Sequence, residues 1–138
     1  MHPRLSVNAI CSMRQTLAED IALWADLGVD HVGLISPKFD DAGIDGLQRA
    51  GTGKYDEGVA AVRDAGLRVS SLSCYRDGIA EVIDLTADLG TDVLYVPPGR
   101  AGAVPWEEAA EAFSAELAPL VARAAGQGIR LAIEPTNP

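Results

Sequence analysis

The sequence contains few of the residues that build metal-binding and redox sites. Its 138 residues include two cysteines, Cys11 and Cys74, which lack the close spacing of a zinc-binding pair. Both fall at the expected ends of strands. We therefore interpret them as small buried thiols. We expect neither a disulfide nor a redox function, because a cytosolic chain rarely keeps a disulfide.

Positive charge and long apolar runs are also scarce. The chain has 11 Lys and Arg residues against 20 Asp and Glu residues, a formal net charge of −9. Such a field repels phosphate backbones, so we expect no nucleic-acid partner. No run approaches the roughly 20 apolar residues of a membrane span, and the first residues lack the apolar segment of a signal peptide. These absences predict a cytoplasmic protein without a membrane partner.

Hydrophobic residues are present in the ordinary proportion of 48%. A chain of this length buries one substantial core and is too short for two domains, so residues 1–138 are expected to form a single domain. Four segments share one pattern of an amphipathic helix, a glycine and an apolar strand. They read ALWADLGVDHVGLI, AAVRDAGLRVSSL, LTADLGTDVLYV and ARAAGQGIRLAI. Their glycines, Gly28, Gly66, Gly90 and Gly128, suit the left-handed residue that ends a helix.

The expected helices each carry an apolar stripe, which we interpret as core packing. Thr16 and Glu19 form a capping box before the first stripe. Trp106 is interpreted as a packing residue rather than a sugar-stacking platform. The stripes are Leu17, Ile21, Trp24 and Leu27; Tyr55, Val59 and Val62; Ile79, Val82, Ile83, Thr86 and Leu89; and Trp106, Ala110, Phe113, Leu117, Leu120 and Ala124.

Strands that alternate with helices predict an α/β fold of parallel βα units with right-handed crossovers. The strands are expected at residues 5–9, 31–35, 67–73, 93–96 and 129–134. Five strands and four helices amount to slightly more than half of a (β/α)₈ TIM barrel, which takes about 250 residues. An open, doubly wound five-stranded sheet is the alternative. It is disfavoured because NAICSMRQT, and no glycine-rich phosphate loop, follows the first strand, and because no final helix covers the last one.

In both architectures the functional residues lie at the C-terminal ends of the strands. Six of the eleven Lys and Arg residues fall in these loops. They are Arg14, Lys38, Arg49, Lys54, Arg76 and Arg100. Two interpretations remain open: the loop cations attract an anionic substrate, or they are ordinary solvated surface charges, which we favour.

The closing segment, LAIEPTNP, delivers a carboxylate, Glu134, at the end of an apolar strand. Pro135 holds the residue before it in an extended conformation. At the mouth of a parallel barrel, such a carboxylate can bind a divalent metal or move a proton next to a carbonyl. Glu134 is therefore the leading candidate for a functional residue.

Three stretches, AEDIALWADLGVDHVGL, AAVRDAGLRVSSLS and GIRLAIEPTNP, resemble the xylose-isomerase-like TIM barrels. This superfamily includes sugar phosphate isomerases and epimerases, hydroxypyruvate isomerase, inosose dehydratase and the AP endonuclease family 2 enzymes. The resemblance runs along the whole chain and reaches the first five of the family's eight strands. It implies that Glu134 is a ligand of a divalent metal (Mn²⁺, Mg²⁺, Co²⁺ or Zn²⁺) and, in the isomerase and epimerase branches, also an acid/base.

The resemblance further implies a sugar (phosphate) isomerase or epimerase that acts on a small sugar or polyol-derived substrate through an enediolate. By position, Asn137, Arg100 and Ser71 are candidates to contact substrate oxygens. The family's other ligands, an Asp, a His and a second Glu on later strands, are absent, and neither His2 nor His31 lies where it can replace them. We therefore expect a truncated chain or partial sequence that is inactive as it stands.

Three alternatives remain open. Two are enzymes of the same superfamily, one like inosose dehydratase and one like an AP endonuclease, although the net charge disfavours the second. The third is a non-catalytic open sheet or half-barrel, whose exposed edge strands favour self-association as a homo-oligomer.

Overall fold

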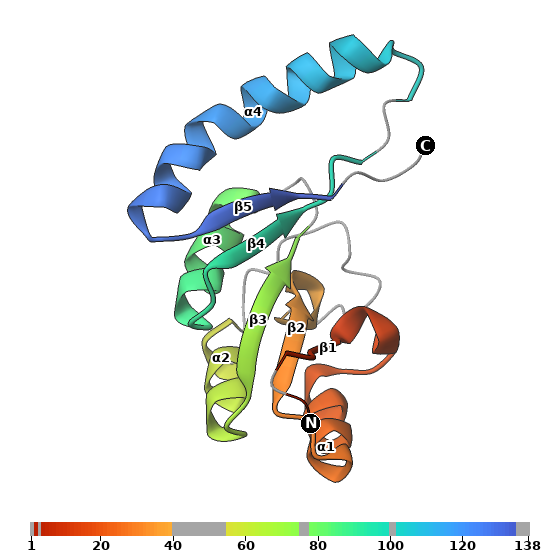
Figure 1. Ribbon diagram of the computed structural model, residues 1–138, viewed down its shortest axis with the longest axis vertical. Helices are drawn as coiled ribbons and strands as arrows, with labels where there is room; N and C mark the ends of the chain where they lie inside the picture. The colour runs from red at the N-terminus through yellow and green to blue at the C-terminus, as the bar shows by residue number, and fades with distance from the viewer. Residues whose placement is uncertain (1, 3, 40–54, 75–77, 100–101, 135–138) are drawn as a thin grey trace.

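The computed structural model describes residues 2, 4–39, 55–74, 78–99 and 102–134. Five parallel strands form one sheet in the order β1-β2-β3-β4-β5 (Figure 1). The strands are β1 (Val7–Asn8), β2 (His31–Ile35), β3 (Arg68–Ser73), β4 (Val93–Val96) and β5 (Arg130–Ile133). The helices are α1 (Leu17–Leu27), α2 (Tyr55–Asp64), α3 (Ile79–Asp88) and α4 (Trp106–Gly126), with short 3₁₀ helices η1 (Ala9–Ser12) and η2 (Ser36–Phe39). In the described part of the chain, no helix is both long and apolar enough to cross a membrane.

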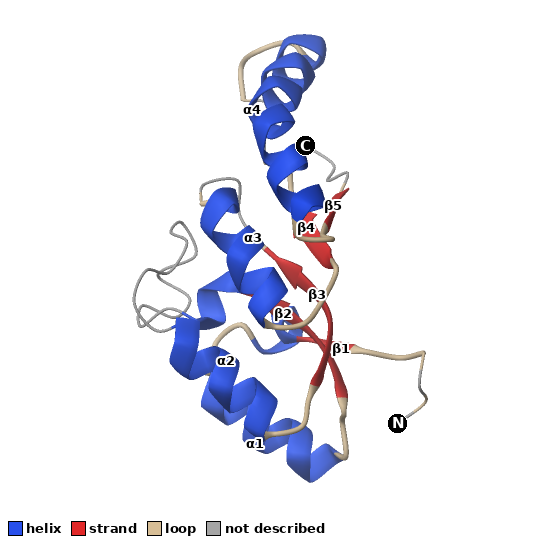
Figure 2. Cartoon of the chain, turned by 90° about the vertical axis from the view of Figure 1, so that its left-hand side faces the viewer, coloured by secondary structure: helices blue, strands red, loops and turns tan. Residues whose placement is uncertain are grey.

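The strand order confirms the partial barrel and excludes the doubly wound sheet. In a doubly wound sheet the order of the strands reverses at a switch point, and helices cover both faces. Here the strands follow each other in chain order, and Figure 2 shows α1, α2 and α3 against the same face of the sheet. The core lies between that face and the helices. It includes Val32, Leu34, Leu72, Leu94 and Val96 from the strands, and Trp24, Val59, Val82 and Ile83 from the helices.

The four glycines of the repeated pattern have the predicted backbone. Their φ angles are +66° at Gly28, +69° at Gly66, +71° at Gly90 and +74° at Gly128, all in the left-handed region. A side chain at these positions is strained whatever the space around it. Each glycine therefore ends a helix and turns the chain back towards the next strand, which is what repeats the βα unit.

The capping box of Thr16 and Glu19 is confirmed, but two residues of the predicted stripes are not core residues. Thr16 Oγ1 accepts the Glu19 N–H, and the Glu19 carboxylate accepts the Thr16 N–H. Leu27 is 67% exposed and Trp106 is 68% exposed, so the packing role predicted for each is wrong. Leu27 is the last residue of α1 and Trp106 the first residue of α4.

The first strand is shorter than predicted, because Asn8 ends it. The side-chain carboxamide oxygen of Asn8 accepts the N–H of Ile10 at 2.9 Å and starts η1 in place of further strand. Cys11 lies in η1 and is exposed, so its prediction as a buried thiol is wrong. Cys74 is buried as predicted, and burial raises the pKa of its thiol to about 12.

Gly58, inside α2, is expected to tolerate no side chain. A Cβ at this position would lie 2.5 Å from Cδ1 of Phe39 and 3.3 Å from Cδ2 of Leu17. The Phe39 ring is buried and packs edge-on against Tyr55, with ring centroids 6.4 Å apart, so it has little room to move. We expect Gly58→Ala to lower the free energy of unfolding by about 1–3 kcal/mol. Helix propensity alone predicts a gain of about 1 kcal/mol.

Urea denaturation measures the change, and Gly126→Ala is the matched control. Gly126 lies at the end of α4, and a Cβ there would meet no atom within 4 Å. Its replacement should leave stability unchanged or raise it. A similar gain in both variants would contradict the assigned contact with Phe39.

Candidate substrate groove

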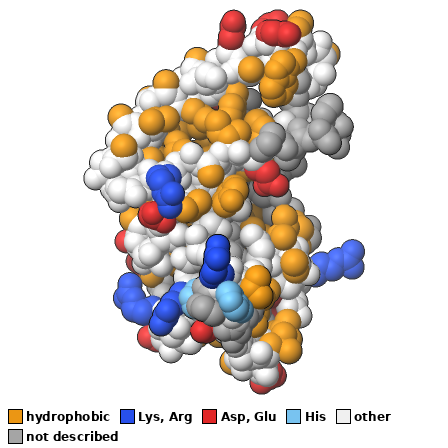
Figure 3. All heavy atoms as spheres, in the orientation of Figure 1, with side chains coloured by type: hydrophobic (Ala, Val, Ile, Leu, Met, Phe, Trp, Pro, Cys, Tyr) orange, Lys and Arg blue, Asp and Glu red, His pale blue; other side chains and the backbone are white. Residues whose placement is uncertain are grey.

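A groove of about 350 Å³ lies on the face of the sheet opposite the helices. Its lining residues alternate along the strands with the buried residues of the helix-covered face. Figure 3 views the molecule from the groove face, whose middle shows mainly uncharged polar side chains and backbone. The lining residues are Ser6, Asn8, Gly33, Ser70, Ser71, Ser73, Tyr95 and Glu134.

A β-bulge places two neighbouring serines in this groove. Val32 pairs with Val69 and Gly33 with Ser71, which leaves Ser70 as an extra residue of β3. Ser70 Oγ donates to the carbonyl of Val32 at 3.1 Å and lies 2.8 Å from Ser6 Oγ, with which it shares a hydrogen bond. These contacts tie β3 to β2 and to the residue that precedes β1, at one end of the groove.

Gly33 leaves space for the side chain of Asn8. A Cβ on Gly33 would lie 2.9 Å from Nδ2 of Asn8 and 3.3 Å from Oγ of Ser71. The oxygen of the Asn8 carboxamide is occupied by the N–H of Ile10. The amide nitrogen of Asn8 is therefore the end of that group that lies over Gly33, beside the Ser71 hydroxyl.

Glu134 lines the groove at the C-terminal end of β5. Its backbone N–H lies 3.4 Å from the carbonyl of Val96, and its side chain is exposed and has no ion-pair partner among the described residues. Tyr95 of β4 contributes an aromatic ring that is 37% exposed. Of the four predicted site residues, Glu134 and Ser71 line the same groove, whereas Arg100 and Asn137 lie outside the described residues.

The family model described as xylose isomerase-like TIM barrel matches residues 21–138. The chain belongs to this family. No curated protein matches it significantly.

Solved structures show the same barrel fold at low sequence identity. Protein SMc04130 from Sinorhizobium meliloti 1021 is 22% identical with a TM-score of 0.72, and the match covers 99% of this chain and 52% of that one. An AP endonuclease family 2 protein from Brucella melitensis is 16% identical with a TM-score of 0.66, covering 98% and 56%. The IolI protein, solved with a bound zinc atom, is 14% identical with a TM-score of 0.62, covering 93% and 50%. The chain thus spans about half the length of these structures.

The described residues of this xylose isomerase-like chain offer one metal ligand in the groove. They contain no group of three His, Cys, Asp or Glu side chains placed to hold a metal ion, and Glu134 is the single carboxylate lining the groove. A divalent cation takes from about four ligands, for Zn²⁺, to about six or more, for Mg²⁺. Glu134 therefore fits as one ligand of a metal site, and the described residues do not supply the other ligands.

His31 does not contribute to the groove. It begins β2 at the opposite end of the sheet, and its Nδ1 lies 3.0 Å from Oδ1 of Asp30. The hydrogen bond from His31 is the largest cause that lowers the pKa of Asp30. His31 therefore lies, as predicted, where it cannot replace a metal ligand at the C-terminal ends of the strands.

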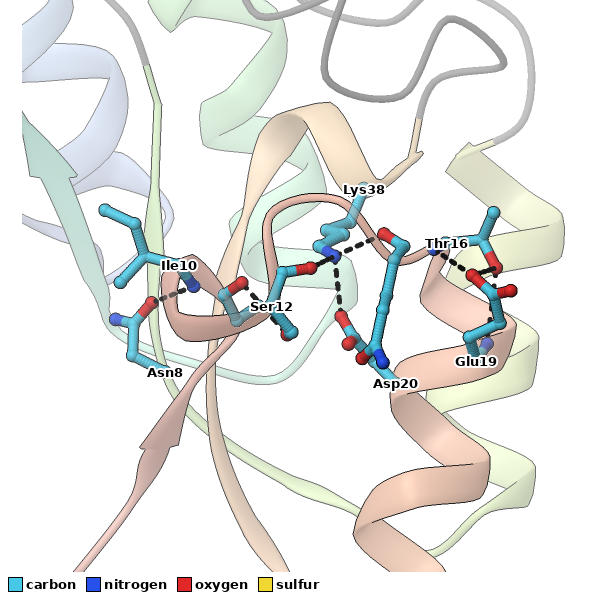
Figure 4. A network of polar contacts seen from close by, with 9 residues as sticks. Asn8, Ile10, Ser12, Thr16, Glu19, Asp20 and Lys38 are labelled. Atoms are coloured by element: carbon cyan, nitrogen blue, oxygen red, sulfur yellow. Dashed lines mark hydrogen bonds and ion pairs between the residues drawn. The ribbon is translucent and has the colours of Figure 1, made fainter.

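Lys38 corrects the prediction of solvated loop cations. Its side chain is 4% exposed, and its Nζ lies 2.8 Å from Oδ2 of Asp20, whose side chain is 0% exposed (Figure 4). Sequence reasoning missed Asp20, although its position gave a signal. It lies three residues after Leu17 and four before Trp24, on the apolar stripe of α1, where a carboxylate requires a buried partner. Arg14 is exposed as predicted, and the other four loop cations lie outside the described residues.

Proposed function

We propose that the groove binds a small sugar or polyol-derived substrate, and that Glu134 moves a proton next to the carbonyl of that substrate. This reaction is of the sugar (phosphate) isomerase or epimerase type. The observation that carries the proposal is the convergence of hydroxyl and carboxamide groups with one carboxylate in a single groove. The net charge of −9 supports a small molecule over a nucleic acid.

The lining suits a polyhydroxylated ligand. Serine and tyrosine hydroxyls both donate and accept hydrogen bonds, and the Asn8 amide adds a donor. A sugar hydroxyl also donates and accepts, so it can exchange its water contacts for groups of the same kind. The volume of about 350 Å³ lies at the lower end of small-molecule sites. Tyr95 offers an apolar ring face for the C–H groups of a sugar.

The proposed chemistry requires a base near the carbon that carries the labile proton. Glu134 takes the proton from the carbon next to the carbonyl, which leaves an enediolate. Return of a proton to the neighbouring carbon moves the carbonyl and isomerises the substrate; return to the opposite face of the same carbon epimerises it. A dehydratase of the inosose type shares the first step. A bound divalent metal would supply polarisation of the carbonyl, with Glu134 as one of its ligands.

Chemical-shift mapping of the ¹⁵N-labelled chain with D-xylose tests the binding proposal. We expect weak, saturable shifts at the backbone amides of Ser71, Ser73 and Tyr95, and weaker binding by Glu134→Gln. Glu81→Gln, on the exposed side of α3, is the matched control and should bind as the wild type does. Shifts scattered over the surface, or equal binding by all three chains, would reject the groove as the substrate site.

The 138-residue chain is expected to show no sugar isomerase turnover in the presence of Mn²⁺. Its described residues supply one metal ligand, and one carboxylate cannot hold the cation against water. A coupled assay of ketose formation from D-xylose measures this. Turnover above that of the Glu134→Gln chain would show that these residues complete a working site by themselves.

A further inference from the structure

Lys38 joins three segments at the C-terminal end of the sheet. It lies in η2, directly after β2, and its Nζ donates to the carbonyls of Ser12, at 2.7 Å, and Gln15, and forms an ion pair with Asp20 (Figure 4). An ammonium group has three N–H donors. Two of them are used on the backbone that connects β1 to α1.

This backbone leads directly to the groove. Ser12 ends η1, and its Oγ donates to the carbonyl of Ala9 at 3.2 Å. The other end of η1 is capped by Asn8, whose amide nitrogen lies over Gly33. Lys38 therefore holds one end of a four-residue turn, and the groove residue Asn8 holds the other.

The ion pair of Lys38 and Asp20 is buried, and apolar side chains could fill the same space. Neutral residues of similar volume often replace a buried pair without loss of stability. They cannot replace the two hydrogen bonds from Lys38 to the carbonyls of Ser12 and Gln15. These two hydrogen bonds fix the position of the segment between β1 and α1, which apolar packing would not do.

We propose that Lys38 is a positioning residue for the groove: by binding the carbonyls of Ser12 and Gln15 it fixes η1, and so holds the amide of Asn8 over Gly33. Asp20 compensates the positive charge of the buried Lys38 ammonium. The functional meaning of this device rests on the proposed use of the groove as a substrate site.

Two variants of the chain separate positioning from stability. Asp20→Leu/Lys38→Met fills the same volume without charge. We expect its thermal midpoint to be at or above that of the wild type, because no charge is left buried. We also expect new positions for the Asn8 side-chain amide resonances and exchange of the Gln15 N–H that is faster by about tenfold or more, since hydrogen bonds to a charged group are lost. Asp20→Asn keeps Lys38 and should do the reverse, with a lower midpoint and unchanged Asn8 resonances.

The proposal is overturned if the double variant keeps the wild-type Asn8 resonances and Gln15 exchange, or if both properties follow the thermal midpoint in the two variants. Should the double variant not fold, Asp20→Asn/Lys38→Met makes the same comparison with neutral side chains of similar size. Leu94, in the middle of the sheet, is the internal reference and should not change. The D-xylose titration is a separate test. If D-xylose does not bind in the groove, the substrate site is rejected, whereas the Asn8 resonances still decide whether Lys38 positions Asn8.

Discussion

Lys38→Met is expected to lower the free energy of unfolding by about 3–5 kcal/mol, a large part of the total for a domain of this size. Methionine fills the volume of the lysine side chain but leaves the Asp20 carboxylate without its cation. That carboxylate is 0% exposed, Lys38 is its ion-pair partner, and neither of its oxygens has a hydrogen-bond donor among the described residues. An unpaired buried charge is far less stable than one in water, and this difference is the expected loss.

Arg130→Met is the matched control, because it also removes one cation from an ion pair. Arg130 Nη2 lies 2.8 Å from Oδ2 of Asp92, but these side chains are 72% and 63% exposed. Solvent screens such a pair, so the change should stay below about 1 kcal/mol. Urea denaturation of the two variants side by side measures the difference. Similar losses in both would mean that the Asp20 site is open to water.

The fold could be predicted from the sequence because its signals are local and repeated. The glycines that follow the helices need a left-handed backbone, which few other residues adopt, and the alternation of stripes and apolar runs fixes the βα order. The end of β1 could not be predicted in the same way. Whether Asn8 continues a strand or caps a turn depends on its side chain finding the N–H of Ile10, a choice between two conformations of similar energy.

The candidate site was predicted in part. Glu134 and Ser71 stand out because a polar residue on or after an apolar strand lies at the functional end of a parallel sheet. Ser70 could not be found from the alternation of side chains along the strand, because the bulge in β3 shifts that alternation by one residue and turns Ser70 into the groove. The partner of Asp20 was equally hidden, since Lys38 follows it by 18 residues and the two meet only when α1 packs beside the end of β2.

The edges of the sheet bear on the predicted self-association. β1 and β5 are the two outer strands, and Ile133 on β5 is 54% exposed. An outer strand leaves backbone hydrogen-bonding groups open to pairing with another chain or with further strands of a barrel. Oligomer formation by this chain stays a prediction, and the sheet order makes β5 the side at which a barrel would continue.

In a complete barrel that carries this chain, Glu134→Gln is expected to lower kcat by about 10²–10⁴-fold, the usual contribution of a general base. Glutamine has nearly the same shape but cannot accept the proton or carry the negative charge. The fold should not change, because Glu134 is held through its backbone N–H and its side chain is exposed. Steady-state assays with the thermal midpoint measured alongside test both statements. Glu81→Gln is the control for the loss of one negative charge elsewhere, and wild-type kcat in the Glu134 variant would move the base to another residue of the barrel.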